Sequence, residues 1–264
     1  MNKKLNIVAL ALVLSAGLTA CGPKAENAPA NNAAQNNAAA TANTEANANA
    51  NKAEKEAPAA EVSEITGEEL DKIMEDKDAK EKVTVIDVRS PEEYKEGHVK
   101  FAINMPLDTF EQDLSKIEDL KDSEVITICN TGKKSGEAAK ILVDNGFKNV
   151  KNAQGVKDFD YTTITKVTNV RGPEFVELAK SGDYTIIDAR DAKDFDAGHV
   201  EGAINVLAEE FDAKYSELPT DKPFLTYCYS GNRSWEVANK LTEKGHEATS
   251  SLDGTKEFDG FELK

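Results

Sequence analysis

Two cysteines occupy equivalent places in the sequence, each at the end of an apolar run and before a short polar loop. Cys129 lies in TICNTGKKS (127–135) and Cys228 lies in TYCYSGNRS (226–234). In both segments two residues and a glycine follow the cysteine, and then one residue, a basic residue and a serine. If a helix begins after the loop, its N-terminus stabilises the thiolate, which is the nucleophilic form of cysteine. The pattern therefore predicts a nucleophile that attacks an anionic, oxygen-rich substrate.

The other residues of the two loops fit the same interpretation. Glycine permits the backbone angles of a nest of N–H groups that binds an anion. The basic residues are expected to face that anion, and the serines are expected to cap the helices that follow. The pairs, first loop before second, are Gly132 and Gly231, Lys134 and Arg233, and Ser135 and Ser234.

The two loops belong to an internal repeat that covers most of the chain after residue 60. Residues 85–104 (VIDVRSPEEYKEGHVKFAIN) match residues 186–205 (IIDARDAKDFDAGHVEGAIN), and the match continues through the cysteine loops to Gly155 and Gly254. Each copy has about 100 residues, which is an ordinary domain size. We therefore expect two domains, here named the first repeat (61–162) and the second repeat (163–264).

Each repeat alternates short apolar runs with helical patterns. In the first repeat, strands are expected at 83–87, 102–104 and 125–129, and a helix is expected to follow and to stop near Gly146. The second repeat shows the same order. Continuous apolar strands that alternate with helices indicate an α/β fold with a mostly parallel sheet and helices on both faces. The reactive loop of such a sheet lies beyond the carboxyl ends of the strands.

At this point the chain resembles the rhodanese family, in two tandem copies over nearly all of residues 61–264. The resemblance rests on DVR…EEY…GHV…AIN with CNTGKKS, and on DAR…KDF…GHV…AIN with CYSGNRS. It implies a sulfurtransferase in which Cys129 and Cys228 take a sulfane sulfur from thiosulfate or a similar donor. The persulfide would be held by loop amides and passed to cyanide or a thiol.

The resemblance also implies which residues contact the donor. The loop residues Gly132, Lys133, Lys134, Gly231 and Arg233 would bind it, and Arg89 and Arg190 would lie near the loops and shape them. In familiar tandem enzymes usually only the second domain keeps its cysteine, whereas both copies keep it here. No cofactor and no metal ligand set are expected, because the sequence has neither a CxxC nor an HExxH motif.

Two other functions stay open. A cysteine-dependent phosphatase or arsenate reductase would use the same fold, but its loop has five residues between cysteine and arginine, whereas four separate Cys228 from Arg233. A non-catalytic binding module outside the cytoplasm is the second alternative. The segment TGKKS does not complete a nucleotide-binding P-loop, because Thr127 and Lys134 stand where that motif needs glycine and Ser or Thr.

Several residues admit a structural interpretation. His98 and His199 are expected to be hydrogen-bonded near strand starts and not to act as bases. Trp235 could line a pocket or simply pack. A disulfide between Cys129 and Cys228 is not expected, because equivalent points of two domains rarely lie close enough.

The first sixty residues have a different composition. Two lysines and an apolar core precede LTAC (18–21), which resembles the lipobox of bacterial lipoproteins. We expect a signal peptide at 1–20, a lipid on Cys21 and a disordered tether rich in Ala and Asn at 21–60. The protein would then be extracytoplasmic and anchored to the bacterial membrane by its lipid.

The charge of the chain limits its partners. The formal net charge is −16, which argues against nucleic acid and against a basic surface that grips anionic lipids. The expected partners are a small anionic sulfur donor, a thiol or cyanide acceptor, and a membrane reached through the lipid anchor.

Overall fold

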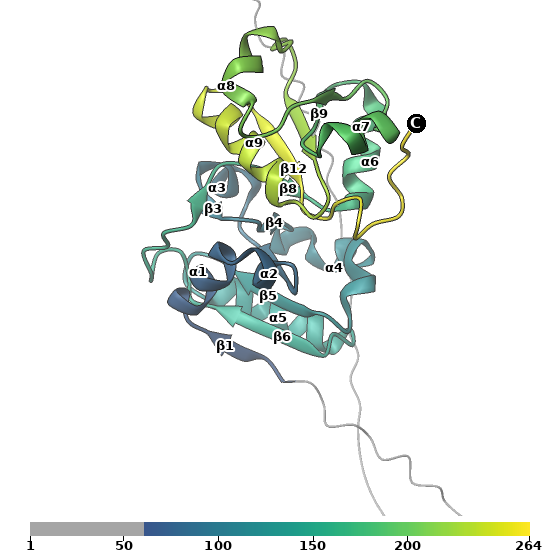
Figure 1. The fold of residues 1–264 in the computed structure, drawn as a ribbon. Coiled ribbons are helices and arrows are strands. Elements are labelled where there is room, and N and C mark those ends of the chain that lie inside the picture. The colour runs from purple at the N-terminus through teal and green to yellow at the C-terminus, as the bar shows by residue number, and fades with distance from the viewer. Residues whose placement is uncertain (1–60) are drawn as a thin grey trace, which may run out of the picture. The chain divides into compact units, whose positions relative to one another are not determined.

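Two five-stranded parallel sheets form the framework of residues 61–264, the part of the chain that the computed structural model describes (Figure 1). The predictions for residues 1–60, including a lipid on Cys21, concern residues outside the described part of the chain. The first repeat contains β1 (Ser63–Ile65), α1 (Gly67–Glu75), α2 (Lys77–Lys80), β2 (Val83–Asp87), α3 (Pro91–Glu96), β3 (His98–Val99), β4 (Ile103–Asn104), α4 (Phe110–Asp113), β5 (Glu124–Ile128), α5 (Lys133–Asp144) and β6 (Asn149–Ala153).

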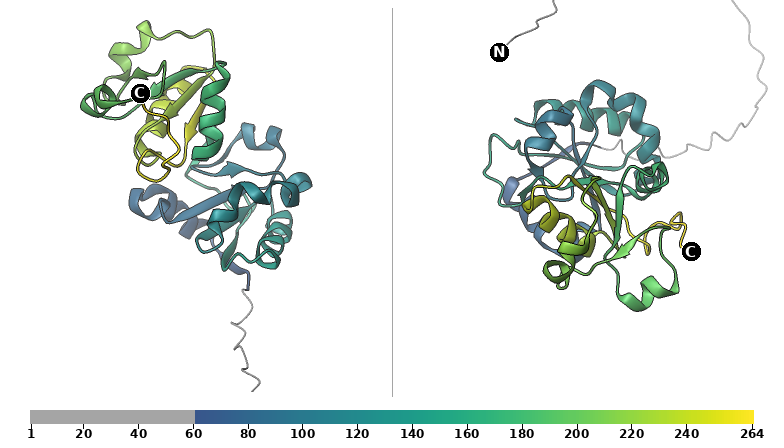
Figure 2. Two further views of the ribbon diagram at one scale, coloured as in Figure 1. Left: turned by 90° about the vertical axis from the view of Figure 1, so that its right-hand side faces the viewer. Right: turned by 90° about the horizontal axis from the view of Figure 1, so that it is seen from above.

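The second repeat has the same elements except for α2 and a counterpart of β3. Its elements are β8 (Thr168–Val170), α6 (Gly172–Ser181), β9 (Thr185–Asp188), α7 (Ala192–Ala197), β10 (Ile204–Asn205), α8 (Phe211–Lys214), β11 (Phe224–Tyr227), α9 (Asn232–Glu243) and β12 (Ala248–Ser251). A short strand, β7 (Ile164–Thr165), precedes β8 and pairs antiparallel with β3. These elements can be followed from two other directions in Figure 2.

The strand order explains where a reactive loop can lie. The first sheet has the order β1-β6-β5-β2-β4, and the second has the equivalent order β8-β12-β11-β9-β10. In the first sheet the chain passes from β1 to β2 and then to β4 in one direction across the sheet. It then returns in the opposite direction to β5 and β6. Because parallel crossovers are right-handed, α1 and α3 cover one face and α4 and α5 cover the other. The direction therefore switches between β2 and β5, and a crevice is expected beyond the carboxyl ends of these two strands.

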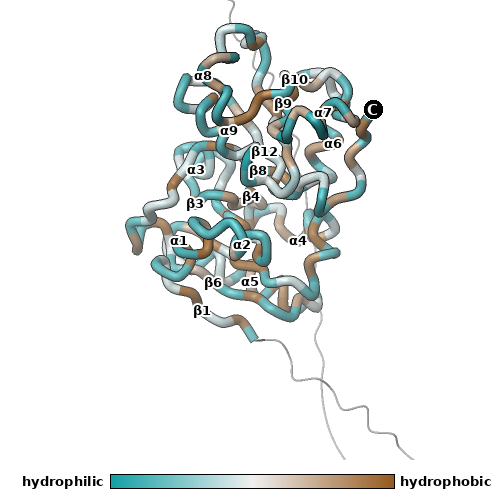
Figure 3. The backbone as a smooth tube through the Cα atoms, in the orientation of Figure 1, coloured by the Kyte–Doolittle hydropathy of each residue, from teal (hydrophilic) through white to brown (hydrophobic). Residues whose placement is uncertain are grey.

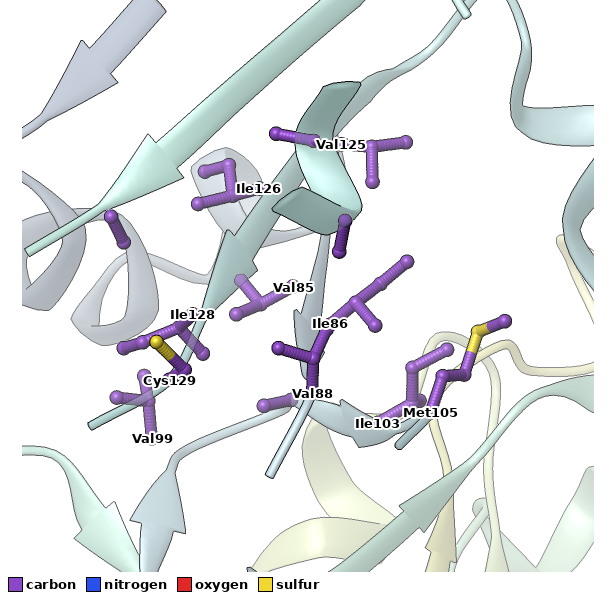
Figure 4. Close-up of a cluster of buried hydrophobic side chains, with 14 of the residues drawn as sticks. Val85, Ile86, Val88, Val99, Ile103, Met105, Val125, Ile126, Ile128 and Cys129 are labelled. Carbon is purple, nitrogen blue, oxygen red and sulfur yellow. The ribbon is translucent and has the colours of Figure 1, made fainter. Parts of the chain in front are cut away.

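The central strands β2, β5, β9 and β11 are buried from both faces, as their continuous apolar sequences predict. Helix α5 places Ala138, Ala139 and Leu142 in the core, and α9 does the same with its equivalent residues. Figure 3 shows hydrophobic and hydrophilic residues interspersed along α5 and α9. Figure 4 shows Cys129 beside Ile128 and Val99 among these core side chains.

Several buried polar contacts join the two repeats. The hydroxyl of Tyr94 accepts a hydrogen bond from the backbone N–H of Asn169 at 3.1 Å. The buried carboxylate of Asp71 accepts bonds from the backbone N–H groups and hydroxyls of Thr162 and Thr163, where the first repeat meets the second. These bonds satisfy every polar group involved, which is what makes burial of a carboxylate tolerable.

An aromatic contact also joins the repeats. The ring of Phe101 packs on Trp235, with 5.7 Å between centroids, and the ammonium of Lys100 lies 4.0 Å from the Trp235 ring. Phe101 has a φ of +64°, a value that is uncommon outside glycine. The equivalent residue of the second repeat is Gly202, with a φ of +78°.

Candidate functional site

Both cysteines lie at the predicted place, directly after the strand at the switch in each sheet. Cys129 follows β5 and Cys228 follows β11, and α5 and α9 begin four residues later. The N-caps of these helices are Gly132 and Gly231, with φ of +75° and +80°. The expectation that glycine supplies left-handed backbone in the loop is therefore confirmed.

The carbonyl groups of each loop are tied to the segment that follows the next strand. The N–H groups of Val156 and Lys157 donate to the carbonyls of Cys129 and Asn130, and Thr255 and Lys256 do the same for Cys228 and Tyr229. The turn glycines allow this approach: a Cβ on Gly155 would lie 2.2 Å from the Asn130 oxygen, and one on Gly254 would lie 1.9 Å from the carbonyl carbon of Tyr229. Because these carbonyls are held on one side, the loop amides are free to face the other, as an anion-binding nest requires.

Cys129 has a direct hydrogen-bond partner for its sulfur. The backbone N–H of Ser135 lies 3.3 Å from Sγ, and the Ser135 hydroxyl lies 3.2 Å from it. The same hydroxyl is 2.6 Å from Oδ1 of Asn152, whose amide nitrogen contacts Glu64 and the Gly132 carbonyl. The expectation that Ser135 caps α5 is wrong, because it lies inside the first helical turn and its hydroxyl serves the sulfur.

The second site arranges its serine differently. Ser234 is likewise not a cap, but its hydroxyl donates to the Gly231 carbonyl at 3.1 Å and accepts from Ser250. Among residues 61–264, no hydrogen bond from Ser234 to the sulfur of Cys228 is formed. The sheet register places Ser250 where the first repeat has Asn152. The two sulfur environments are therefore not copies of each other.

The basic residues of the loops differ as well. Lys133 and Lys134 are exposed and extend from the start of α5. Arg233 is 46% exposed at its side chain, pairs with Asp191 at 2.8 Å and stacks over the ring of Tyr229. The hydroxyl of Tyr229 in turn contacts Asp191 and Asp194. Arg233 is thus held at the rim of the second site, whereas the lysines of the first site are held by no ion pair within residues 61–264.

The two arginines of the DxR segments lie in buried ion pairs. Arg89 binds both oxygens of Asp87 and the Gly97 carbonyl, and Arg190 binds Asp188 and the Gly198 carbonyl in the same way. Their guanidinium groups hold the chain between a strand end and the following helix. Within residues 61–264, no hydrogen bond or ion pair of either guanidinium group reaches a cysteine loop, so their assignment to substrate binding stays a prediction.

The histidines and the tryptophan have structural surroundings. Both ring nitrogens of His98 contact carbonyls, of Tyr94 and Val167, and burial lowers the pKa of His98. The ring of His199 stacks on Phe195, as His98 stacks on Tyr94. The structural interpretation of the histidines agrees with these contacts, and Trp235 packs between the repeats.

Two residues near the loops were not anticipated from the sequence. Asn152 lies on β6 and Lys80 lies on α2, and the latter contacts the second loop at the Ser230 carbonyl. Neither matches its counterpart in the repeat, so the internal alignment gave no signal for them. Their roles depend on which strands and helices become neighbours in space.

The described residues offer neither a cluster of metal ligands nor a membrane span. Within residues 61–264, no three His, Cys, Asp or Glu side chains come together as a metal site would need. In the same range, every helix is too short or too polar to cross a bilayer. Cys129 and Cys228 are both free thiols and both buried.

Comparison with known proteins gives a consistent result. The family model of the rhodanese-like domain matches residues 66–157 and 173–257. Thiosulfate sulfurtransferase PspE of Escherichia coli (strain K12) is 42% identical over 70 residues, which is 26% of this chain and 67% of that protein. The tRNA uridine(34) hydroxylase of Photorhabdus laumondii is 35% identical over 74 residues, which is 26% of this chain and only 21% of that enzyme.

Solved structures include similar chains. A rhodanese with anions from E. coli is 38% identical and is covered over 98% of its length by 32% of this chain, with a TM-score of 0.30. A thiosulfate sulfurtransferase from Pseudomonas aeruginosa is 18% identical and aligns with 77% of this chain and 43% of its own, with a TM-score of 0.33. Since the family model matches two separate segments that together make up well over half of the sequence, the chain belongs to the rhodanese-like domain family and contains two copies of the domain.

Proposed function

We propose that the protein is a sulfurtransferase that moves a sulfane sulfur from thiosulfate or a similar donor to a thiol or cyanide. The Cys thiolate attacks the outer sulfur of thiosulfate, the S–S bond of the donor breaks, and sulfite leaves with the electron pair. The cysteine then carries a persulfide anion. An acceptor such as cyanide attacks its terminal sulfur, so that thiocyanate leaves and the thiolate returns. No external oxidant or reductant is needed.

The observation that carries the proposal is the loop itself. A thiol at the end of the switch-point strand is enclosed by a loop whose carbonyls are bonded outward and whose helix begins four residues later. This arrangement directs amide dipoles toward an anionic sulfur, which is the charge formed by the attack. The name of the related PspE protein is consistent with this chemistry.

A phosphatase or arsenate reductase is less well supported by the loop. The first loop offers Lys133 and Lys134, which are point charges without the planar fork that binds a tetrahedral phosphate in two places. In the second loop, only four residues separate Cys228 from Arg233, one fewer than in the phosphatase loop. The shorter loop and these basic residues favour a sulfur donor.

We expect the two sites to be unequal. Planar Arg233, supported by Tyr229, is suited to orient the sulfonate end of thiosulfate, whereas Lys133 and Lys134 are flexible. Cys228 should therefore carry most of the thiosulfate:cyanide activity. Cys129, whose loop has only these flexible lysines, would be slower or would use another donor.

Rates for Cys129→Ser, Cys228→Ser and the double variant test the proposal. Intact mass after thiosulfate treatment should show two added sulfur atoms in the wild type, one in each single variant and none in the double variant. Full activity in the double variant would refute sulfur transfer by these cysteines. Nearly full activity in Cys228→Ser would refute only the ranking of the sites.

The N-terminal residues lead to a separate proposal about location. LTAC (18–21), behind a basic and apolar leader, supports a lipid on Cys21 that anchors the protein on the extracytoplasmic side of the membrane. Membrane fractions should then retain the protein after a high-salt wash, and Cys21→Ala should release it. Equal retention of the variant would rule out the lipid anchor.

A further inference from the structure

The short helix α2 of the first repeat contacts the cysteine loop of the second repeat. Its last residue, Lys80, is 3% exposed, and its ammonium donates to the Ser230 carbonyl at 2.6 Å and reaches the Leu252 carbonyl at 3.5 Å. Two exposed contacts lie beside this one but outside the loop itself: Lys77 pairs with Glu236 on α9, and the side-chain amide of Asn232 donates to Glu81. The first repeat therefore supports the second active-site loop from outside.

Three successive carbonyl groups of that loop accept hydrogen bonds, and the bond from Lys80 to Ser230 is the third. The carbonyls of Cys228 and Tyr229 accept from Thr255 and Lys256, and the next carbonyl, that of Ser230, accepts from Lys80. In a planar trans peptide the C=O and N–H point in opposite directions. A carbonyl fixed toward Lys80 therefore turns the N–H of Gly231 away from the first repeat.

The first loop has no such support. The counterpart of Ser230 is Thr131, and within residues 61–264 no side chain of the second repeat bonds to its carbonyl. The second repeat also has no counterpart of α2, because α6 leads directly to the turn before β9. The contact is therefore one-directional: the first repeat supports the second site, and the second repeat gives no equivalent support in return.

The charge of Lys80 needs compensation in this environment. Burial lowers the pKa of Lys80, while Glu257, Glu81, Cys228 and Asp253 act in the opposite direction. None of these carboxylates lies within ion-pair distance of the Lys80 ammonium in the described part of the chain. The Lys80 ammonium bonds to carbonyls and lies 4.8 Å from the centroid of the Phe101 ring, which offsets part of the cost of burying its charge. A nearby anion offsets more of that cost. A thiolate or persulfide at Cys228 supplies such an anion.

We propose that Lys80 is a positioning residue for the second active site, fixing the Ser230–Gly231 peptide and stabilising the anionic sulfur at Cys228 from the first repeat. This proposal rests on the proposed function only for its persulfide readout, since thiolate reactivity can be measured separately. It makes the chemistry at Cys228 depend on the first repeat, while the chemistry at Cys129 is independent of Lys80.

The experiment uses the full chain with one reactive cysteine at a time. In the Cys129→Ser background, Lys80→Met should slow both persulfide formation and iodoacetamide alkylation at Cys228 about tenfold near neutral pH. The pH profile of alkylation should move upward, because a nearby cation that favours the thiolate is lost. In the Cys228→Ser background, the same substitution should change the rates at Cys129 less than about twofold.

Two variants control for structure. Lys77→Met removes an exposed ion pair from the same helix and should leave the Cys228 rates and pH profile unchanged. Lys80→Arg keeps the charge and should restore the pH profile of Lys80→Met toward that of the wild type. Met is apolar and similar in length to Lys, but it leaves the Ser230 carbonyl without its donor, so the rates are compared well below the melting temperature of Lys80→Met.

The outcomes separate the possible failures. An unchanged Cys228 pH profile in Lys80→Met, or equal slowing at Cys129 and Cys228, would overturn the proposal. If Cys228 in the wild-type loop forms no persulfide but the alkylation profile shifts as expected, the proposed function fails and the role of Lys80 stands.

Discussion

The serine beside the first sulfur gives the sharpest test of how the two sites differ. In Ser135→Ala the backbone N–H still reaches Sγ of Cys129, but the hydroxyl at 3.2 Å is lost. A hydrogen bond to a charged group contributes about 1.5–3 kcal/mol. Competition from Oδ1 of Asn152 at 2.6 Å reduces the net gain toward the lower end of that range. We therefore expect persulfide formation at Cys129 to slow about tenfold, since about 1.4 kcal/mol corresponds to a factor of ten.

The assay is single-turnover persulfide formation from thiosulfate in the Cys228→Ser background, followed by intact mass. The matched control is Ser234→Ala in the Cys129→Ser background. Its hydroxyl bonds to the Gly231 carbonyl instead of the sulfur, so the rate at Cys228 should change less than about threefold. Ser135→Ala also leaves the Asn152 oxygen unpaired, so rates are compared well below the melting temperature. Equal effects of the two substitutions would show that the serine–sulfur contact does not assist the reaction.

Three further predictions follow from the contacts of single residues. Gly231→Ala should impair the Cys228 site far more than Gly132→Ala impairs the Cys129 site. A Cβ on Gly231 would lie 2.4 Å from the Leu252 carbonyl oxygen, whereas one on Gly132 would lie 3.7 Å from the side chain of Asn152. Comparable losses of single-site rate would contradict this. Asp71→Ala should lower the free energy of unfolding by about 3 kcal/mol in urea titration, since it removes the acceptor of the buried donors of Thr163 and of the part-buried donors of Thr162. A loss below about 1 kcal/mol would be too small for that explanation. Burial and the hydrogen bond to Asp194 raise the pKa of Tyr229 to about 12. The difference spectrum of wild type minus Tyr229→Phe should therefore show no phenolate band below about pH 11. A titration midpoint near the ordinary tyrosine pKa would refute this prediction.

The sequence predicted the parts of the fold that depend on local pattern. The strand expected at 83–87 is β2 with the same bounds, and the strand expected at 125–129 is β5, shifted by one residue. The placement of both cysteines after these strands and before a helix was also predictable, because apolar runs, glycine and helical periodicity lie close together in the chain. These signals come from residues that are close together in the sequence, so they can be recognised without knowledge of the tertiary structure.

Contacts between distant elements were not predictable in the same way. The serine in each loop looked like a helix cap, since nothing local shows that the chain already turns at Gly132 and that Ser135 then faces the sulfur. Asn152 reaches the site only because β6 pairs with β5, and Lys80 only because α2 of one repeat meets the loop of the other. The buried ion pair of Arg89 with Asp87 likewise depends on the direction in which the Arg89 side chain points beyond the end of β2.

The left-handed backbone at Phe101 has a consequence for how the two repeats could have diverged. A duplication begins with two identical copies, and this backbone position now carries glycine in the second repeat and phenylalanine in the first. A side chain at such angles costs about 1 kcal/mol, and here its ring packs on Trp235, a residue for which the first repeat has Gly136. The two copies are therefore complementary to each other and not interchangeable. A chimera built from two first repeats or two second repeats would keep either the ring or its partner but not the pair, so the molecule needs one repeat of each kind.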